Sequence, residues 1–464
     1  MRKRIVIAGL LLLALFTSAM AQQNGMRHKR SDGYMWPTDS LVLEKLDKWK
    51  DLKFGVIFHW GLYSVPGILE SWVLCGEDVD WIKRPQNMTY EEYKKWYWGL
   101  KDSLNPVKFN PEQWVDIMKK GGMRYMVFTT KHHEGFCMFD TKQTDFSIMN
   151  GPFSKNPRAN IAKHVFESFR KQGFMIGAYF SKPDWHSEYY WWPYYPTRDR
   201  NVNYDVKRHP ERWEKFRQFT FNQIQELMSD YGNIDILWLD GGQVAKRFNQ
   251  DIRMDKIATM ARQKQPGLIM VDRTVKGEFE NYQTPEDEIP ATQLDIPWET
   301  CLSMNGWGWR CEGEYKSAKR IIATLIEVVA KGGNLLLGVG PTPQGVIDDE
   351  AAERILSIGQ WLDKNGKAIY STLSAKHYKD GNVWFTMNKN EQTMYAIYAL
   401  PENEKEVPEI IEWTENIPVK KNKVFLLQNH QRVKCEVENN KVRVYLPKNI
   451  DRSASLAFSF EVRK

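Results

Sequence analysis

Five apolar runs, each ending in polar side chains, constrain the fold of this chain more than any other feature. Near-continuous β-favouring hydrophobes are typical of strands buried on both faces of a parallel sheet. The runs are FGVIFHWG (54–61), RYMVFTTKHHEG (124–135), FMIGAYFSKPDWH (174–186), IDILWLDGG (234–242) and LIMVDR (268–273). Amphipathic helical stretches such as Pro111 to Lys120 and Glu211 to Tyr231 lie between them. Strand and helix in alternation predict a doubly wound sheet or a (β/α)8 barrel.

The polar ends of the runs favour the barrel. In a barrel the carboxyl ends of all strands converge on one face, whereas a doubly wound sheet gathers its ligands near one switch point. No G-x-G-x-x-G motif follows the first run. The polar side chains at the run ends are His59, His132, His133, Asp184, His186, Asp240, Asp272 and Arg273.

The pattern changes after residue 372. Short runs such as NVWFTMN, TMYAIYAL, KVRVYLP and LAFSFEV, with turn residues between them, replace the helical period. They predict an antiparallel β-sandwich over residues 373–464. We therefore expect a (β/α)8-like catalytic domain at 22–372, followed by this second domain.

The first residues, MRKRIVIAGLLLLALFTSAMAQ, predict a secretory signal peptide at 1–21. A positive start precedes an apolar stretch too short for a typical membrane anchor, and Ala19-Met20-Ala21 is a small-x-small cleavage site. No later run approaches the roughly 20 apolar residues that a membrane span needs. The sequence predicts export to the periplasm or the exterior without membrane insertion of the mature chain.

The charge, the aromatic content and the cysteines limit the kinds of ligand that the chain could bind. The net charge of +7 comes from 65 basic and 58 acidic residues spread along the chain, which argues against a nucleic-acid binder. Aromatic residues make up 13% of the chain, and their flat apolar faces suit both a large core and the C–H faces of sugars. The five cysteines have no metal-like spacing, and a Cys301–Cys311 disulfide stays open.

Asp240 is the strongest candidate for chemistry. An isolated carboxylate is costly to bury, so one at the end of an apolar strand needs a partner or a role. Trp238, two residues earlier, shares its strand face and places an aromatic wall beside it. Three histidines at the same rim, together with Arg273, suit a ligand rich in hydroxyl groups, most simply a sugar. The three are His59, His132 and His133.

Two other functions stay open on the residues alone. A metal-dependent hydrolase would use His132, His133, Asp184 and His186, although the H-x-H and H-E-x-x-H spacings of zinc sites are absent. A glycan-binding protein without turnover would keep the aromatic pocket. Against the second alternative, the acid-rich segment 276–301 offers the second carboxylate that a sugar hydrolase needs, in Glu286 or Glu299.

Six motifs together resemble the α-L-fucosidases of glycoside hydrolase family 29. They are GVIFHWGLYSVP (55–66), KHHEGFCMFDT (131–141), WLDGG (238–242), TPEDE (284–288), PWETC (297–301) and KGGNLLLGVGPTPQGVI (331–347). The resemblance runs from about residue 35 to 375. It implies a (β/α)8-like barrel with a C-terminal β-sandwich, retaining hydrolysis of fucosylated oligosaccharides or glycoconjugates, and no metal or other cofactor.

The resemblance also implies roles. Asp240 matches the nucleophile, and Glu286 in TPE is favoured over Glu299 as the acid/base. Relatives often have Glu-Trp in the loop after the first strand, but this chain has ESW, so that Ser71 stands in place of the glutamate and Glu70 is displaced by one. Galacto-configured or sulfated relatives of fucose therefore stay alternative substrates. The matching sugar-binding positions are His59, Trp72, His132, His133, Tyr179, Trp238 and Arg273.

Overall fold

A parallel seven-stranded sheet, in the order β5-β4-β3-β2-β1-β7-β6, forms the centre of the first region. The structure is a computed structural model that describes residues 33–462 apart from 78–81, 86 and 422, so the predicted signal peptide lies outside it. The strands are β1 (Phe54–Phe58), β2 (Tyr125–Lys131), β3 (Met175–Ser181), β4 (Ile236–Asp240), β5 (Ile269–Asp272), β6 (Glu299–Ser303) and β7 (Asn334–Val339).

Both faces of these strands are buried, as their unbroken apolar runs predict. On β4, Leu237 and Leu239 join the core under the surrounding helices, whereas Ile236 and Trp238 belong to a separate core inside the barrel. The alternation follows from the two-residue period of a strand. Asp240 continues the inward series, so the last inward position of β4 is a carboxylate at the mouth.

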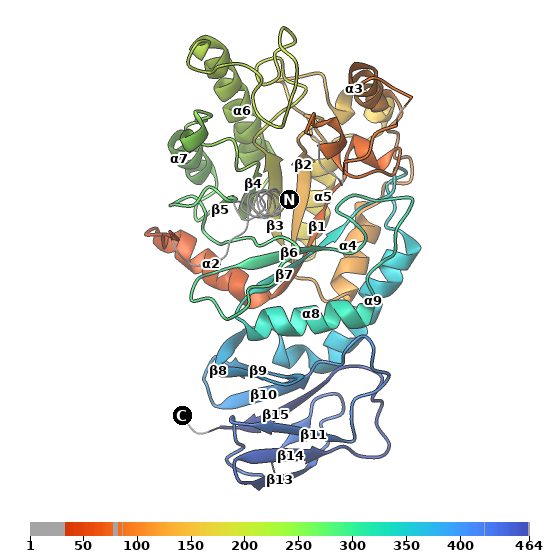
Figure 1. Ribbon diagram of the computed structural model, residues 1–464, viewed down its shortest axis with the longest axis vertical. Coiled ribbons are helices and arrows are strands. Elements are labelled where there is room, and N and C mark those ends of the chain that lie inside the picture. Colours follow the sequence, from red (N-terminus) through yellow and green to blue (C-terminus); the bar gives the residue numbers. More distant parts are fainter. Residues whose placement is uncertain (1–32, 78–81, 86, 422, 463–464) are drawn as a thin grey trace, which may run out of the picture.

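Helices follow the strands and cover the outside of the sheet (Figure 1). In α4, Pro111 occupies the first turn and the Asn110 side chain accepts hydrogen bonds from two backbone N–H groups, which satisfies donors that a helix start leaves free. The helices are α2 (Ser40–Leu52), α3 (Tyr90–Gly99), α4 (Pro111–Lys120), α5 (Ile161–Lys171), α6 (Pro210–Asp230), α7 (Met254–Lys264), α8 (Ala318–Ala330) and α9 (Asp349–Asn365).

Between β5 and β6 the barrel is closed by an irregular segment, residues 279–287, which we call the closing segment. Its first part runs antiparallel to β5, with the Asn281 N–H donating to the Met270 carbonyl at 2.8 Å. Its second part runs parallel to β6, where the Cys301 N–H donates to Pro285 at 3.0 Å. The predicted (β/α)8-like barrel is thus confirmed, with this segment in the place of one strand.

Two antiparallel sheets form the C-terminal region, in the orders β12-β15-β10-β9-β8 and β11-β14-β13. Side chains of both sheets share one core, in which Phe385 and Phe458 meet Trp413 and Val444, so the sheets pack as the predicted sandwich. The strands are β8 (Thr372–Asp380), β9 (Val383–Asn388), β10 (Thr393–Tyr398), β11 (Ile410–Thr414), β12 (Phe425–Leu426), β13 (Lys434–Glu438), β14 (Lys441–Tyr445) and β15 (Leu456–Glu461).

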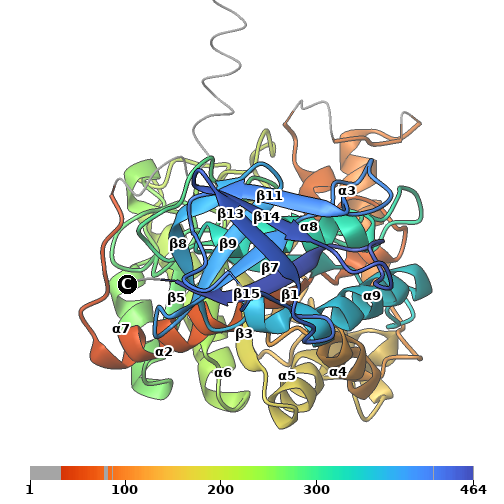
Figure 2. The same ribbon diagram turned by 90° about the horizontal axis from the view of Figure 1, so that it is seen from below.

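The sandwich packs under the barrel, and α8 lies between them (Figures 1 and 2). The Trp361 indole on α9 donates to the Ser455 carbonyl at 2.7 Å, and the Gln293 amide donates to Ala375 at 2.8 Å. These contacts tie the two regions together. Among the described residues, the helices are too short or too polar to cross a bilayer.

Candidate active site

Asp240 is held by donors from three neighbouring strand ends. Its Oδ1 accepts from Arg273, beyond β5, at 3.1 Å and from the adjacent Gly241 N–H at 2.8 Å. Its Oδ2 accepts from the Tyr179 hydroxyl on β3 at 2.8 Å. The side chain keeps 16% exposure, so it is fixed in position yet reachable from the mouth.

These partners decide the charge of Asp240. Burial opposes ionisation, but the Arg273 guanidinium, with the Tyr179 hydroxyl and the Gly241 N–H, outweighs it and holds the pKa of Asp240 far below its usual range. Asp240 is therefore a carboxylate at any physiological pH. An ionised, oriented and accessible carboxylate is the form that a nucleophile requires.

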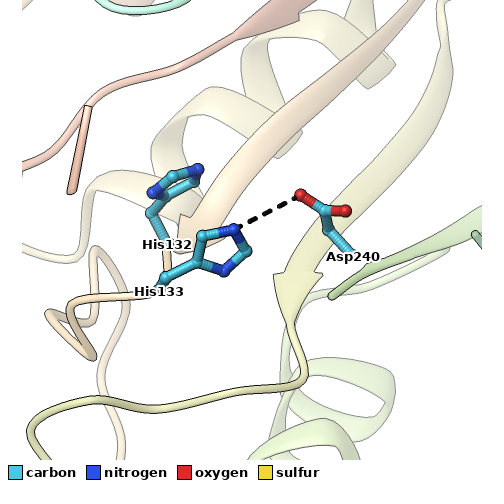
Figure 3. A group of neighbouring side chains, drawn as sticks. All are labelled: His132, His133 and Asp240. Carbon is cyan, nitrogen blue, oxygen red and sulfur yellow. Dashed lines mark ion pairs between the residues drawn. The ribbon is translucent and has the colours of Figure 1, made fainter. Parts of the chain in front are cut away.

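His133 faces Asp240 with its other nitrogen anchored. The Ser181 hydroxyl donates to the Pro183 carbonyl at 2.7 Å, so it accepts from His133 Nδ1 at 2.7 Å, which leaves Nε2 as the unprotonated nitrogen of the neutral ring. Burial lowers the pKa of His133 to about 4. Nε2 lies 3.7 Å from Asp240 Oδ2 (Figure 3), and two facing acceptors leave a place for a donor such as a sugar hydroxyl.

The other two histidines are neutral as well. Burial lowers the pKa of His59 to about 3 and that of His132 well below its usual value. His132 Nδ1 is hydrogen-bonded to the Ser71 hydroxyl at 2.6 Å, so the residue that stands in place of the usual glutamate orients a site histidine. His59 Nδ1 is buried and has no protein partner in the described structure. Neutral imidazoles of this kind both donate to and accept from hydroxyl groups.

Aromatic rings wall the site. Tyr179 stacks on Trp238 with centroids 5.2 Å apart, and Arg273 lies over the same indole. Trp72 meets His133 edge to face at 4.9 Å. Trp307, from the loop after β6, lies 5.3 Å from His59. The structure thus brings together all the positions to which the resemblance assigns sugar binding, and Trp307 lies beside them.

Glu286 reaches the mouth from the closing segment. Its carboxylate pairs with the second terminal nitrogen of Arg273, the guanidinium that also holds Asp240. Its side chain is 41% exposed, which makes it the accessible partner. The Arg273 guanidinium therefore keeps two carboxylates close together, the partly buried Asp240 and the solvent-exposed Glu286.

Glu299 lies elsewhere, at the start of β6 and hence at the floor of the barrel. It accepts a hydrogen bond from Tyr125 at 2.7 Å and one from the Trp238 indole at 3.3 Å. Burial raises the pKa of Glu299 to about 7 against the effect of these donors. The residue is fully buried, and Trp238 lies between it and the mouth.

The alternative metal set is divided by the fold. Asp184 is paired with the buried Lys131 at 3.0 Å, and the His186 ring stacks flat on Phe146. The described residues instead bring His132, His133 and Asp240 together, with one ligand atom from each within 4.8 Å of the others (Figure 3). The Arg273 cation already lies on Asp240, where a metal ion would compete with it.

Sequence reasoning misjudged two groups near the site, since it gave Glu70 no role and set Asp272 at the mouth with the other polar strand ends. Glu70 is buried, and its Oε1 accepts from the backbone N–H groups of Trp307 and Gly308. Asp272, counted among the polar strand ends, is paired with Lys182 beneath the surface. Two sequence signals could have indicated these contacts: for Glu70, the ESW sequence in place of the usual Glu-Trp, and for Asp272, the unusual Lys182 inside an apolar run. Cys301 and Cys311 are free thiols.

Comparisons with known proteins agree on one family. A family model described as alpha-L-fucosidase matches residues 20–367. Human plasma alpha-L-fucosidase is 27% identical over 392 residues, which cover 78% of this chain and 77% of the relative. Alpha-L-fucosidase isoenzyme 1 from Paenibacillus thiaminolyticus superimposes with a TM-score of 0.75 at 25% identity, covering 92% of this chain and all of that one. The Thermotoga maritima alpha-fucosidase in complex with fucose has a TM-score of 0.70 at 25% identity, covering 90% and 98%.

Proposed function

This chain belongs to the alpha-L-fucosidase family of glycoside hydrolases, and we propose that it is an exo-acting enzyme that releases terminal α-L-fucose from glycans with retention of configuration. One observation carries the proposal. The ionised Asp240 and the exposed Glu286 share the guanidinium of Arg273. A retaining glycosidase needs two carboxyl groups only about 5 Å apart, and two carboxylates bound to the same guanidinium suit that spacing.

In the first step, Asp240 attacks the anomeric carbon and forms an ester bond to it. The bond between that carbon and the leaving oxygen breaks, and Glu286 gives its proton to this oxygen. Before this step Glu286 must leave Arg273 and take up a proton from solvent, and its exposure makes both feasible. This movement leaves Asp240 in place, because Arg273 keeps its contact with Asp240 through its other terminal nitrogen.

In the second step, Glu286 takes a proton from water, which attacks the anomeric carbon and breaks the ester to Asp240. Two displacements restore the α configuration. The neutral histidines and the Tyr179–Trp238 wall hold the sugar hydroxyls and its apolar face during both steps. The relative from Thermotoga maritima is a structure in complex with fucose, which supports this sugar.

Product stereochemistry and substrate range test the proposal. NMR of the first product from an aryl α-L-fucoside is expected to show the α-anomer, followed by mutarotation. First appearance of the β-anomer would mean inversion and another pair of residues. The matched aryl α-L-galactoside, which differs from the fucoside only by a hydroxyl on C6, and sulfated fucosides are the competing substrates, and faster cleavage of either would replace fucose as the preferred sugar.

A metal-dependent reaction is the second candidate because His132, His133 and Asp240 could hold an ion. We expect full activity after dialysis against EDTA and no stoichiometric metal by elemental analysis. Activity lost to EDTA and restored by a divalent ion would contradict the two-carboxylate mechanism.

Export belongs to the same proposal. The signal peptide that the sequence predicts at residues 1–21 would deliver the enzyme to the periplasm or the medium, where fucosylated glycans are met. Mass spectrometry of the protein from its native host is expected to find a mature N-terminus at Gln22. An uncleaved chain retained in the cytoplasm would contradict this location.

A further inference from the structure

Trp307 covers the side of the mouth beside His59, at the ends of β1 and β7. Its ring lies 5.3 Å from His59 and packs against β7, where a Cβ on Gly338 would come within 2.8 Å of the indole. A glycine at that place in β7 makes room for the ring. Trp307 therefore forms the wall on the β1–β7 side, beside the same histidine that faces Tyr179 at 5.3 Å.

The loop that carries Trp307 has no regular structure of its own between β6 and α8. Its backbone is held by a side chain more than 200 residues earlier. Glu70 Oε1 accepts from the Trp307 N–H at 3.0 Å and from the Gly308 N–H at 3.2 Å. Glu70 is only 2% exposed, so water does not compete for these bonds.

The approach of the loop is close on both sides. A Cβ on Gly308 would lie 2.7 Å from the Tyr63 ring, so the backbone is pressed against the segment that follows β1. Glu70 also lies near the site, because the hydroxyl of the next residue, Ser71, is hydrogen-bonded to His132 at 2.6 Å. Glu70 thus connects the loop after β1 to the loop after β6 across the entrance.

We propose that Glu70 is a positioning residue, which holds Trp307 as a wall of the sugar pocket and so sets the affinity for the sugar rather than the rate of bond cleavage. The assignment rests on the proposed function, because it takes a sugar to be the occupant. Glu70 does not touch the substrate in this scheme. Its two hydrogen bonds end on the backbone of the loop, and only the Trp307 ring meets the ligand.

Two variants separate the acceptor from the bulk of the side chain. Glu70→Met keeps the length and removes the acceptor, whereas Glu70→Gln keeps an oxygen for both N–H groups. With an aryl α-L-fucoside, we expect Glu70→Met to raise KM about tenfold and to leave kcat within about threefold, as for the loss of the acceptor of two buried hydrogen bonds. Glu70→Gln is expected to restore most of the affinity.

A double-variant cycle tests whether the effect passes through the ring. Trp307→Ala is expected to raise KM by a similar factor, and Glu70→Met is expected to add little in the Trp307→Ala background. Additive effects in the cycle would overturn the proposal, because Glu70 would then act on the sugar by another route.

The position of the ring can be followed without any substrate. In protein labelled with 5-fluorotryptophan, the fluorine resonance that disappears in Trp307→Phe belongs to Trp307. We expect it to shift and broaden in Glu70→Met and to return in Glu70→Gln. Glu280 offers the matched control, since it is equally buried and also accepts from two backbone N–H groups, those of Thr274 and Lys276. Glu280→Met is expected to leave the Trp307 resonance in place.

The two readouts fail separately. An unchanged Trp307 resonance in folded Glu70→Met would overturn the positioning role even if the enzyme cleaves fucosides. A resonance that moves as expected, in a wild-type protein that cleaves no fucoside, would keep Glu70 as the anchor of the loop and contradict the proposed function and the affinity effect instead.

Discussion

The mouth and the floor of the barrel each hold a carboxyl group, and one indole lies between them. Asp240 at the mouth lies two residues beyond Trp238, whose indole N–H donates to Glu299 at the floor. Both groups experience burial, yet the pKa of Asp240 falls and that of Glu299 rises to about 7. The difference lies in the partners: a guanidinium contacts Asp240 at 3.1 Å, whereas the hydrogen-bond donors of Glu299 are neutral.

Between these two acids, the positive charge of Arg273 beside Asp240 is the main difference, and it favours ionisation of Asp240. The ionised acid is also the one that a substrate can reach, since Glu299 is fully buried. In the proposed mechanism the reaction takes place at the mouth, and Glu299 at the floor supports the Trp238 ring. Four experiments test this division, from the largest expected effect to the smallest.

Removing the nucleophile should have the largest effect. Asp240→Asn is expected to lower kcat by about 10⁴-fold or more, within the range seen when a nucleophile is removed, because the covalent route is lost. The side chain keeps nearly the same volume, so the thermal transition should stay cooperative. Kinetics with an aryl fucoside and a thermal melt measure both. Near-normal kcat would end the role of Asp240.

Glu286→Ala and Glu299→Ala compare the two candidate acids directly. Loss of the acid/base is expected to slow a natural fucosyl oligosaccharide by about 10² to 10⁴-fold and to spare the first step on an activated aryl fucoside. Azide should then rescue Glu286→Ala and yield α-fucosyl azide, because it attacks the face opposite the ester to Asp240. Glu299→Ala should show no rescue. Rescue of Glu299→Ala alone would reverse the assignment.

The role of the guanidinium can be tested by pH. Arg273→Met removes the charge that holds the pKa of Asp240 down, so Asp240 should protonate at higher pH. The acid limb of the kcat/KM profile is then expected to move upward by about 1 to 3 pH units, with a lower maximum. Arg273→Lys, which keeps a positive charge, is the control. An acid limb that does not move would separate the charge of Asp240 from Arg273.

The smallest effect on catalysis is expected at the floor. Glu299→Gln keeps an acceptor for Tyr125 and Trp238 and should change kcat/KM by less than about tenfold. Its signature is stability. Because burial raises the pKa of Glu299 from 4.5 to about 7, the unfolded chain releases a proton in this window that the folded protein keeps.

The free energy of unfolding of the wild type should therefore fall, relative to Glu299→Gln, as the pH rises from about 4.5 to 7. Urea melts of both proteins at several pH values measure this difference. A difference that stays constant over the window would mean that Glu299 is ionised in the folded state, as Asp240 is.

The part of the site built on strands could be predicted from the sequence. Asp240, His59 and His133 end apolar runs, and parallel strands bring such ends to one face. The closing segment could not be predicted in the same way. Glu286 and Glu299 lie in one acid-rich stretch without periodicity, so the sequence does not show where β6 begins. In the structure β6 begins at Glu299, which places Glu299 at the floor, while Glu286 pairs beside Cys301 nearer the mouth.

The other differences between the predicted and the observed site also arise from contacts that the local sequence does not show. Asp184 and Asp272 end apolar runs just as Asp240 does, but buried lysines pair with them and remove them from the mouth. A lysine inside a strand pattern does not reveal its partner. Glu70 contacts a loop more than 200 residues later, and no local pattern encodes a contact over that distance.

The closing segment carries the acid/base candidate outside the strand framework of the barrel. Backbone hydrogen bonds pair it with β5 and β6, and two of its side chains add to them: Asn281 Oδ1 accepts from the Met270 N–H of β5, and the Thr284 hydroxyl accepts from Arg273. An engineer who wishes to vary leaving-group preference, or the balance between hydrolysis and glycosyl transfer, should therefore change the exposed Asp287 and its neighbours on the surface and keep Asn281 and Thr284, which fix the segment.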